Sequence, residues 1–146
     1  MIVRVRRRSG SAAVETALLL PFMLLLMTAI FDIGFAAWEQ MQVQSAAAAG
    51  AEYAVRNSWN AGQISSIVST ATGASGISAT PTPSQFCACP VAGSLTTIAC
   101  NATCANGNKP GIYALITAQK SHFTVLQYPA FSQPLTLSGQ VTVRLQ

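Results

Sequence analysis

The sequence predicts an α+β fold, in which one long N-terminal helix, partly membrane-spanning, carries a small C-terminal antiparallel β-sheet domain. Three observations lead to this prediction. Residues 12–31 are almost continuously apolar, an alanine-rich stretch without proline follows them, and residues 135–145 alternate between apolar and polar side chains. Hydrophobic residues make up 51% of the 146 residues and charged residues only 8%. Soluble domains carry about a quarter charged residues, so the composition favours a membrane segment.

The chain divides into four segments. Residues 1–10 form a basic leader and residues 11–57 a long helix. Residues 58–111 are rich in Ser, Gly and Thr and contain the cysteines, and residues 112–146 are strand-like. Outside the helix this leaves about 90 residues, enough for one small domain.

Positive charge is concentrated in the leader. Four of the eight basic residues lie there: Arg4, Arg6, Arg7 and Arg8. By the positive-inside rule they keep the N-terminus in the cytoplasm and place everything after about Asp32 outside. The rest of the chain is formally neutral and has no basic stripe, so no nucleic-acid partner is expected.

The apolar segment is long enough to cross a membrane. At about 1.5 Å per residue, residues 12–31 span about 30 Å of hydrocarbon. Alanine is the best helix former, so the alanine-rich stretch continues the helix to about Asn57, with Pro21 as the place where a bend is expected. Small residues recur every fourth position, at Ala46, Gly50 and Ala54. That spacing lets helices approach closely.

The outer part is predicted to hold a second, short helix and a sheet. Ile64 begins an apolar pattern that continues a helix to about Thr72. The cysteine-containing stretch reads as a loop held by crosslinks. Residues 112–118 are rich in strand-forming side chains, residues 123–126 continue that strand, and residues 135–145 form the last strand. We expect the sheet to pack on the outer half of the long helix.

The four cysteines predict disulfides. They are Cys87, Cys89, Cys100 and Cys104. An even count in a small extracytoplasmic domain is typical of disulfides, whereas a zinc site would need a Cys-x2-Cys pair and more histidine than His122 alone. Pairing Cys87 with Cys89 would close a very tight loop, so cross-pairs are favoured, with their order left open. No metal or cofactor is expected.

Catalysis is poorly supported by the sequence. No Asp or Glu follows Glu52, so the outer domain lacks a carboxylate for a general base or a catalytic triad. His122 lies on a predicted strand, where a surface or packing role is expected. Asp32 lies at the outer end of the apolar span, either as an interfacial residue or paired with another helix of an assembly. We therefore expect a protein that is not an enzyme.

The informative motif joins the leader to the helix. A basic leader, Gly10, and Glu15 five residues later inside an apolar helix form the layout of prepilin-type signals. Glycine leaves the scissile bond open to a membrane protease, and cleavage between Gly10 and Ser11 would create a new amine on Ser11. A carboxylate at the centre of a membrane helix costs about 2.5–3.5 kcal/mol, less near the interface, and such groups are usually paired. We expect Glu15 to pair with the amine of a neighbouring subunit; the simpler reading is an acid that complements the helix dipole.

The same stretch resembles a known family. GSAAVETALLLPFMLLLMTAIFDIGFAAW, followed by AAAAGAEYAVRN, is similar to the N-terminal signature of TadE-like proteins, pseudopilins of the tight-adherence (Tad, Flp) pilus machinery. The resemblance covers about residues 9–57 and departs from the family at Thr16, where members often carry Phe or Tyr. The positions that fit are Gly10, Val14, Glu15, Ala17, Pro21, Gly34, Ala49, Gly50, Ala51 and Arg56.

The resemblance implies a function in assembly. It implies cleavage by an aspartic-type prepilin peptidase and a role as a pseudopilin or minor pilin of a Tad-type, type IV-like pilus or secretion assembly, in pilus biogenesis and adhesion. The implied partners are the membrane, other pilin-like subunits and an inner-membrane assembly platform, in a hetero-oligomer. The implied location is a single-pass position in the inner membrane, with the C-terminus periplasmic, and from there an extracellular pilus. Adhesion, secretion and DNA uptake all remain open as the purpose of the system.

The alternative is a secreted or membrane-anchored extracytoplasmic binding module with an ordinary signal sequence. A signal peptidase would then cut on the outer side, near Ala36–Ala37. The helical pattern that continues across this site argues against the alternative, and so does Glu15 inside the would-be hydrophobic region.

Overall fold

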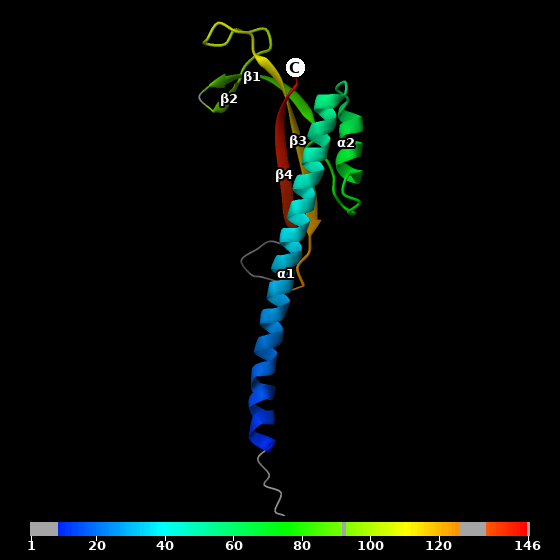
Figure 1. The fold of residues 1–146 in the computed structure, drawn as a ribbon, viewed down its shortest axis with the longest axis vertical. Coiled ribbons are helices and arrows are strands. Elements are labelled where there is room, and N and C mark those ends of the chain that lie inside the picture. The colour runs from blue at the N-terminus through cyan, green and yellow to red at the C-terminus, as the bar shows by residue number, and fades with distance from the viewer. Residues whose placement is uncertain (1–8, 92, 126–133, 146) are drawn as a thin grey trace, which may run out of the picture.

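A computed structural model of the chain describes residues 9–91, 93–125 and 134–145. The elements follow one another in the order α1 (Ser9–Arg56), α2 (Ala61–Thr70), β1 (Ser84–Val91), β2 (Ser94–Thr97), β3 (Gly111–His122) and β4 (Leu135–Leu145). The strands form one antiparallel sheet in the order β2-β1-β3-β4. Figure 1 shows α1 as a long rod with the sheet and α2 packed along its C-terminal half. The predicted α+β fold, a long helix with a small antiparallel sheet, is confirmed.

Helix α1 is continuous over 48 residues, with Pro21 inside it. Its two threonines are hydrogen-bonded within the helix. The Thr16 Oγ1 donates to the carbonyl of Ala12 at 2.6 Å, and the Thr28 Oγ1 donates to the carbonyl of Leu24 at 2.8 Å. Such bonds let a helix carry threonine among apolar residues without an unpaired polar group.

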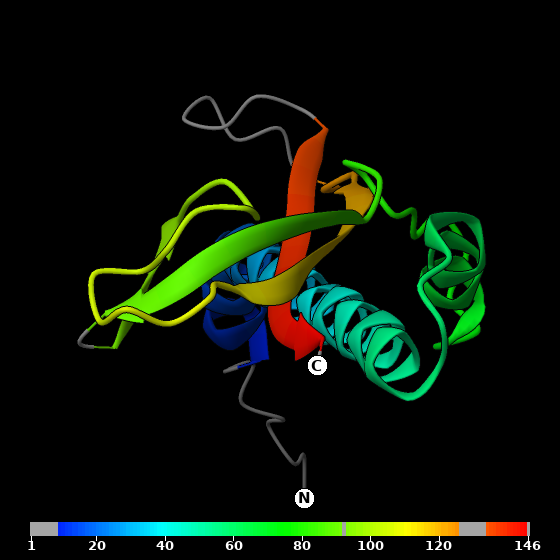
Figure 2. The same cartoon turned by 90° about the horizontal axis from the view of Figure 1, so that it is seen from above.

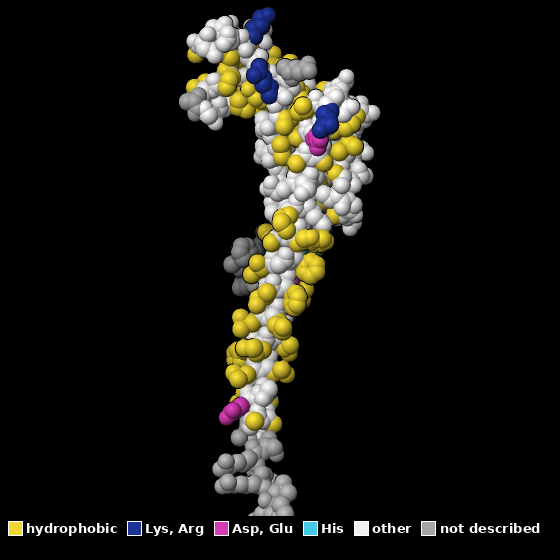
Figure 3. Space-filling model, in the orientation of Figure 1, with side chains coloured by type: hydrophobic (Ala, Val, Ile, Leu, Met, Phe, Trp, Pro, Cys, Tyr) yellow, Lys and Arg dark blue, Asp and Glu magenta, His cyan; other side chains and the backbone are white. Residues whose placement is uncertain are grey.

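The two halves of α1 have different surroundings. Large apolar side chains from Val14 to Phe31 are exposed, and Figure 3 shows them along the rod below the domain. Contacts with the outer domain begin at Asp32, which bonds to the chain just after β3, and from Val43 onward the helix supplies fully buried residues. One helix therefore serves as a bare apolar rod at one end and as a core element at the other.

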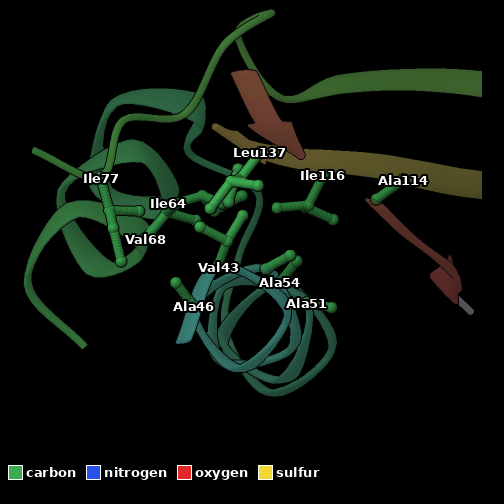
Figure 4. Close-up of a cluster of buried hydrophobic side chains, with 12 residues drawn as sticks. Val43, Ala46, Ala51, Ala54, Ile64, Val68, Ile77, Ala114, Ile116 and Leu137 are labelled. Atoms are coloured by element: carbon green, nitrogen blue, oxygen red, sulfur yellow. The ribbon is translucent and has the colours of Figure 1, made fainter. Parts of the chain in front are cut away.

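The core lies between the C-terminal half of α1, helix α2 and one face of the sheet (Figure 4). Its largest fully buried side chains are Val43, Ile64, Val68 and Ile116. Small residues on α1 make the contact close. A Cβ atom on Gly139 of β4 would lie 3.0 Å from the backbone of Gln44, so only glycine lets this strand approach α1 at its present distance.

Strand β4 follows the predicted alternation. Leu137 and Gly139 are buried, whereas Thr136, Ser138 and Gln140 are exposed. The strand pairs with β3 along its whole length, from Leu135 opposite His122 to Leu145 opposite Ile112. The period of two thus identified both the strand and its buried face.

Helix α2 begins where the chain turns back at the end of α1. The side chain of Asn60 caps it by accepting the N–H of Gln63 at 3.1 Å. Its buried face, Ile64 and Val68, packs on α1. The short helix expected from Ile64 to about Thr72 is therefore present, three residues longer at its start and two shorter at its end.

Two expectations about the strands were wrong. The cysteine stretch, expected to be a loop, contains β1 and β2, which Figure 2 shows projecting from the side opposite α2. Pro90 is tolerated because β1 pairs with β3 only up to Ala88 and beyond that point with β2 alone. Strand β3 also ends at His122 rather than continuing through Phe123, and Leu126 lies outside the described residues.

Candidate assembly and membrane-anchoring site

The predicted cleavage site lies in the first turn of α1. Gly10 is exposed, and a Cβ atom there would meet nothing within 4 Å. Ser11 follows in the same turn. The leader arginines are outside the described residues. The peptide bond between Gly10 and Ser11 thus belongs to an open segment of backbone at the free end of the rod.

Glu15 lies one turn further along α1 and is exposed to its surroundings. It borders a shallow hollow of about 380 Å³, whose other lining residues are Ala12, Thr16, Leu19, Leu20 and Met23. Within the described part of the chain no cation pairs with Glu15. The helix therefore presents one acidic side chain on an apolar surface.

The apolar half of α1 is long and apolar enough to cross a membrane, judged by length and composition. Its side chains do not pack on the domain: Leu18, Phe22 and Ile30 are each about two-thirds exposed. A helix that is apolar on all faces is typical of a membrane span or of the interior of a large assembly. This half of α1 is therefore a candidate membrane anchor.

Asp32 marks the point where the domain meets the helix. Its carboxylate is buried and accepts the backbone N–H of Val125 at 3.0 Å. The sequence offered two options for this residue, an interfacial position or a pair with another helix. The structure gives a third arrangement, in which the carboxylate holds the chain that follows β3.

A second acid, Glu39, lies two turns further along α1 and faces β3. Its Oε1 lies 2.8 Å from the Nζ of Lys120, and its Oε2 lies 2.7 Å from the Nδ1 of His122. All three side chains are largely buried, with exposed fractions of 17%, 14% and 8%. Burial raises the pKa of Glu39, but the hydrogen bonds and positive charge of its two partners outweigh burial and hold the pKa below its ordinary value. These three residues form the junction clamp.

The junction clamp bears on two expectations about catalysis. Of the surface and packing roles expected for His122, the structure shows the packing role, because the side chain is buried. The outer domain also does not lack a carboxylate, because α1 supplies Glu39 to it. Among the described residues no nucleophile is bonded to the imidazole: Nε2 is buried without a partner, and Ser121 follows the strand period to the opposite face. The clamp acts in the structure as a bond between helix and sheet.

The small residues Ala46, Gly50 and Ala54 are buried inside the domain. A Cβ atom on Gly50 would lie 2.6 Å from the Cγ2 of Val68 in α2 and 3.2 Å from the Cγ2 of Ile116 in β3. The close approach that their spacing predicts therefore occurs within the chain, between α1, α2 and the sheet.

The cysteines form two cross-paired disulfides. Cys87 bonds to Cys100 and Cys89 to Cys104. Both bonds tie β1 to the segment between β2 and β3, which lacks regular structure. The predicted class of pairing is present, and the structure supplies the order that the sequence left open.

Sequence reasoning missed the role of Asp32, Glu39 and their partners. Two signals could have revealed it. The two acids are seven residues apart, which puts them on one face of a helix, and Lys120 and His122 are two apart, which puts them on one face of a strand. A charged pair on each element, in a chain with only 8% charged residues, indicates a helix–sheet contact.

Residues 10–52 match the family described as TadE-like protein. The matched segment begins at Gly10, includes Glu15 and ends four residues before α1 does. The resemblance seen in the sequence is confirmed over this segment, and a TadE-like segment suggests an association with the Tad pilus. No curated protein and no solved structure matches the chain.

Proposed function

We propose that this chain, whose long helix carries a TadE-like segment, is a pseudopilin or minor pilin subunit of a Tad-type pilus or secretion assembly. The observation that carries the proposal is Glu15. It is an exposed carboxylate on an apolar rod, five residues after Gly10, with no cation beside it in the described residues. A lone acid in a membrane is costly, so its presence indicates a partner from another subunit.

The leader and Glu15 act in sequence. The four leader arginines hold the N-terminus in the cytoplasm, where a prepilin peptidase hydrolyses the bond between Gly10 and Ser11. Hydrolysis leaves a carboxylate on Gly10 and an amine on Ser11. The amine is protonated at neutral pH and becomes a cation at the end of an otherwise apolar helix. In the membrane the attraction between this amine and Glu15 is stronger than in water, because the dielectric constant is low.

The pair sets the position of each incoming subunit. Ser11 and Glu15 are four residues apart, so pairing the amine of one helix with Glu15 of a parallel neighbour offsets the two helices by about 6 Å along their axes. The same pair can close within one chain, since residues four apart share a helix face. Assembly, rather than the stability of the isolated subunit, is therefore the informative measurement.

The location follows from the same segment. We place residues 12–31 in the inner membrane as a single span, with the N-terminus cytoplasmic and the domain periplasmic. The two disulfides support this placement, because disulfides persist in the periplasm and outside the cell but are rare in the cytosol. Other pilin-like subunits and an inner-membrane platform are the proposed partners, in a hetero-oligomer that acts in pilus biogenesis and adhesion.

The alternative of a signal-peptidase-cleaved binding module has less support. A cut near Ala36–Ala37 would fall inside α1, between Asp32 and Glu39. It would separate Asp32 from the domain, so the N–H of Val125 would lose the carboxylate that accepts it, and the remaining helix would begin in a frayed turn. N-terminal sequencing separates the two functions: a mature chain starting at Ser11 supports the pseudopilin, and a start near Trp38 supports the module.

The test of the proposal replaces Glu15 and follows cleavage and assembly separately. We expect Glu15→Ala and Glu15→Gln to be cleaved after Gly10 and to enter sheared pili at least about tenfold less than the wild type, because a lost ion pair of about 1.4 kcal/mol changes an equilibrium tenfold. Thr16→Ala is the matched control, since Thr16 is the exposed neighbour and its hydroxyl bonds only within the helix. Normal incorporation of both Glu15 variants would contradict the proposal.

A further inference from the structure

Two apolar side chains project from the chain just after β3. Phe123 is 72% exposed and Val125 is 78% exposed, the largest exposed fractions of any large hydrophobic side chains in the described residues. They are two positions apart, with the half-buried Thr124 between them. Such a pair is out of place on a surface that faces only water.

The position of these side chains along α1 is fixed by two anchors. The Nδ1 of His122 lies 2.7 Å from Glu39, and the N–H of Val125 is donated to Asp32 at 3.0 Å. The chain from His122 to Val125 therefore runs beside about two turns of α1, toward the apolar half. Phe123 and Val125 lie at the level where the predicted membrane span ends.

Helix α1 carries apolar side chains at the same level. Phe35 and Trp38 contact each other edge to face, with ring centroids 6.4 Å apart, and both are more than half exposed. With Phe31 they line an apolar hollow of about 390 Å³ on the helix, together with Ile30 and Gly34. Figure 3 shows that hydrophobic side chains continue along the rod to the base of the domain.

We propose that Phe31, Phe35, Trp38, Phe123 and Val125 form a junction collar that seats the outer domain on the lipid of the outer face of the inner membrane. The collar is continuous with the apolar half of α1, so the membrane that surrounds the span also reaches the collar. Aromatic residues are favoured at this boundary between headgroups and acyl chains. The inference rests on the proposed membrane anchoring and adds a second, domain-borne contact with the bilayer.

The charges around the collar support lipid as its partner. Glu39 and Lys120 are paired with each other, and the Asp32 carboxylate is bonded to the chain that it holds. The nearby charged groups thus have bonding partners inside the junction, and the exposed side chains of the collar are apolar. Before assembly the domain is held against the membrane in one orientation rather than tethered freely.

The test uses single-tryptophan variants of the full chain in phosphatidylcholine vesicles. Trp38→Phe and Trp59→Phe together give a chain without tryptophan. One tryptophan is then introduced at a time: Phe123→Trp in the collar, Phe22→Trp in the span or Leu95→Trp in β2. A nitroxide on carbon 5 of the acyl chain quenches fluorophores near the headgroups, and a nitroxide on carbon 12 quenches fluorophores near the middle of the bilayer. We expect the position-123 probe to lose at least about half of its emission to the carbon-5 nitroxide, the position-22 probe to lose as much to the carbon-12 nitroxide, and the position-95 probe to be unaffected by either.

The controls separate this inference from the proposed function. Quenching at position 22 but not at position 123 overturns the collar and leaves the membrane anchor intact. If position 22 is not quenched, the anchoring fails and the collar with it. Lipid quenching at position 123 that is present at low protein-to-lipid ratios supports the collar. Shielding of position 123 from aqueous acrylamide that appears only at high protein density would assign the surface to a second copy of the chain and overturn the lipid contact.

Discussion

At the scale of single residues, glycines and buried charges decide how closely the parts of this chain approach. Gly50 and Gly139 are the two positions where a Cβ atom would meet another element of the core at 3.0 Å or less. Glu39 joins α1 to β3 through two cations. The periodicity of the sequence predicted which residues face inward, but not which contacts are too close for a methyl group. That information depends on the distance between elements, which no local pattern records.

We expect Gly50→Ala to destabilise the domain by about 1–3 kcal/mol, because the added methyl group overpacks the contact with Val68 and Ile116. Gly34→Ala is the matched control on the same helix: nothing lies within 4 Å of its Cβ position, so it should be neutral or stabilising by up to about 1 kcal/mol. Chemical unfolding of the full chain in detergent, followed by circular dichroism, measures both. Equal effects of the two substitutions on stability would contradict the prediction that the close contact at Gly50 excludes a methyl group.

The junction clamp predicts a loss of stability in acid. The folded pKa of Glu39 is below its ordinary value, so its contribution is present above the unfolded value of about 4.3 and is lost as the pH falls through the lower, folded pKa. His122 is an ionic partner of Glu39 only when it is protonated. We expect the denaturant concentration at half-unfolding of the wild type to decrease as the pH is lowered below about 4.3. The same midpoint of Glu39→Gln should change less over this pH range.

Asp32 is a second carboxylate that faces this region, so it needs its own control. The unfolding midpoint of Asp32→Asn should still fall with pH if Glu39 carries the effect. A Glu39→Gln protein with the full acid sensitivity of the wild type would rule out the clamp as its source.

At the scale of elements, strong periodicity was predictable and weak periodicity was not. The long helix and β4 were recognised because their patterns extend over many residues. Strand β1 was missed because its sequence, SQFCACPV, contains little β-branched side chain and includes a proline. Its place in the sheet comes from pairing with β3 and from two disulfides, which are contacts between distant segments.

The disulfides are expected to hold the β1–β2 hairpin and not the whole domain. They close loops with sequence separations of 13 and 15, for which the chain-entropy model gives about 3 kcal/mol each. Replacing Cys89 and Cys104 together by serine should therefore raise amide exchange in β2 and the outer end of β1 by about tenfold or more, while β4 and α2 keep their protection. Hydrogen exchange with mass spectrometry measures each element, and a uniform loss of protection would contradict the prediction.

At the scale of the whole molecule, one helix connects three environments. Its first turn carries the proposed cleavage site, its apolar half is the proposed membrane anchor, and its last turns contribute to the core of the domain. The family match covers most of this helix and ends before α2. This arrangement fits the proposed role, in which the helix serves assembly and carries the domain outside the membrane.

The orientation of the whole molecule should depend on the leader. Replacing Arg4, Arg6, Arg7 and Arg8 by glutamine removes the charge that keeps the N-terminus inside. We expect the fraction of chains with an external C-terminal tag, measured by protease added to spheroplasts, to fall severalfold. Arg56→Gln with Arg144→Gln is the control, because these exposed residues lie on the side that the proposed topology translocates, where positive charge has little influence on orientation.

The result also tests the connection between orientation and processing. A chain that inserts in reverse exposes the bond between Gly10 and Ser11 on the wrong side, so uncleaved chains should be those with an internal tag. If the four leader substitutions reduce cleavage but leave the tag external, the arginines serve peptidase recognition alone. In that case the orientation is set by translocation of the domain itself, and the apolar rod would need no charged leader to cross the membrane in the right direction.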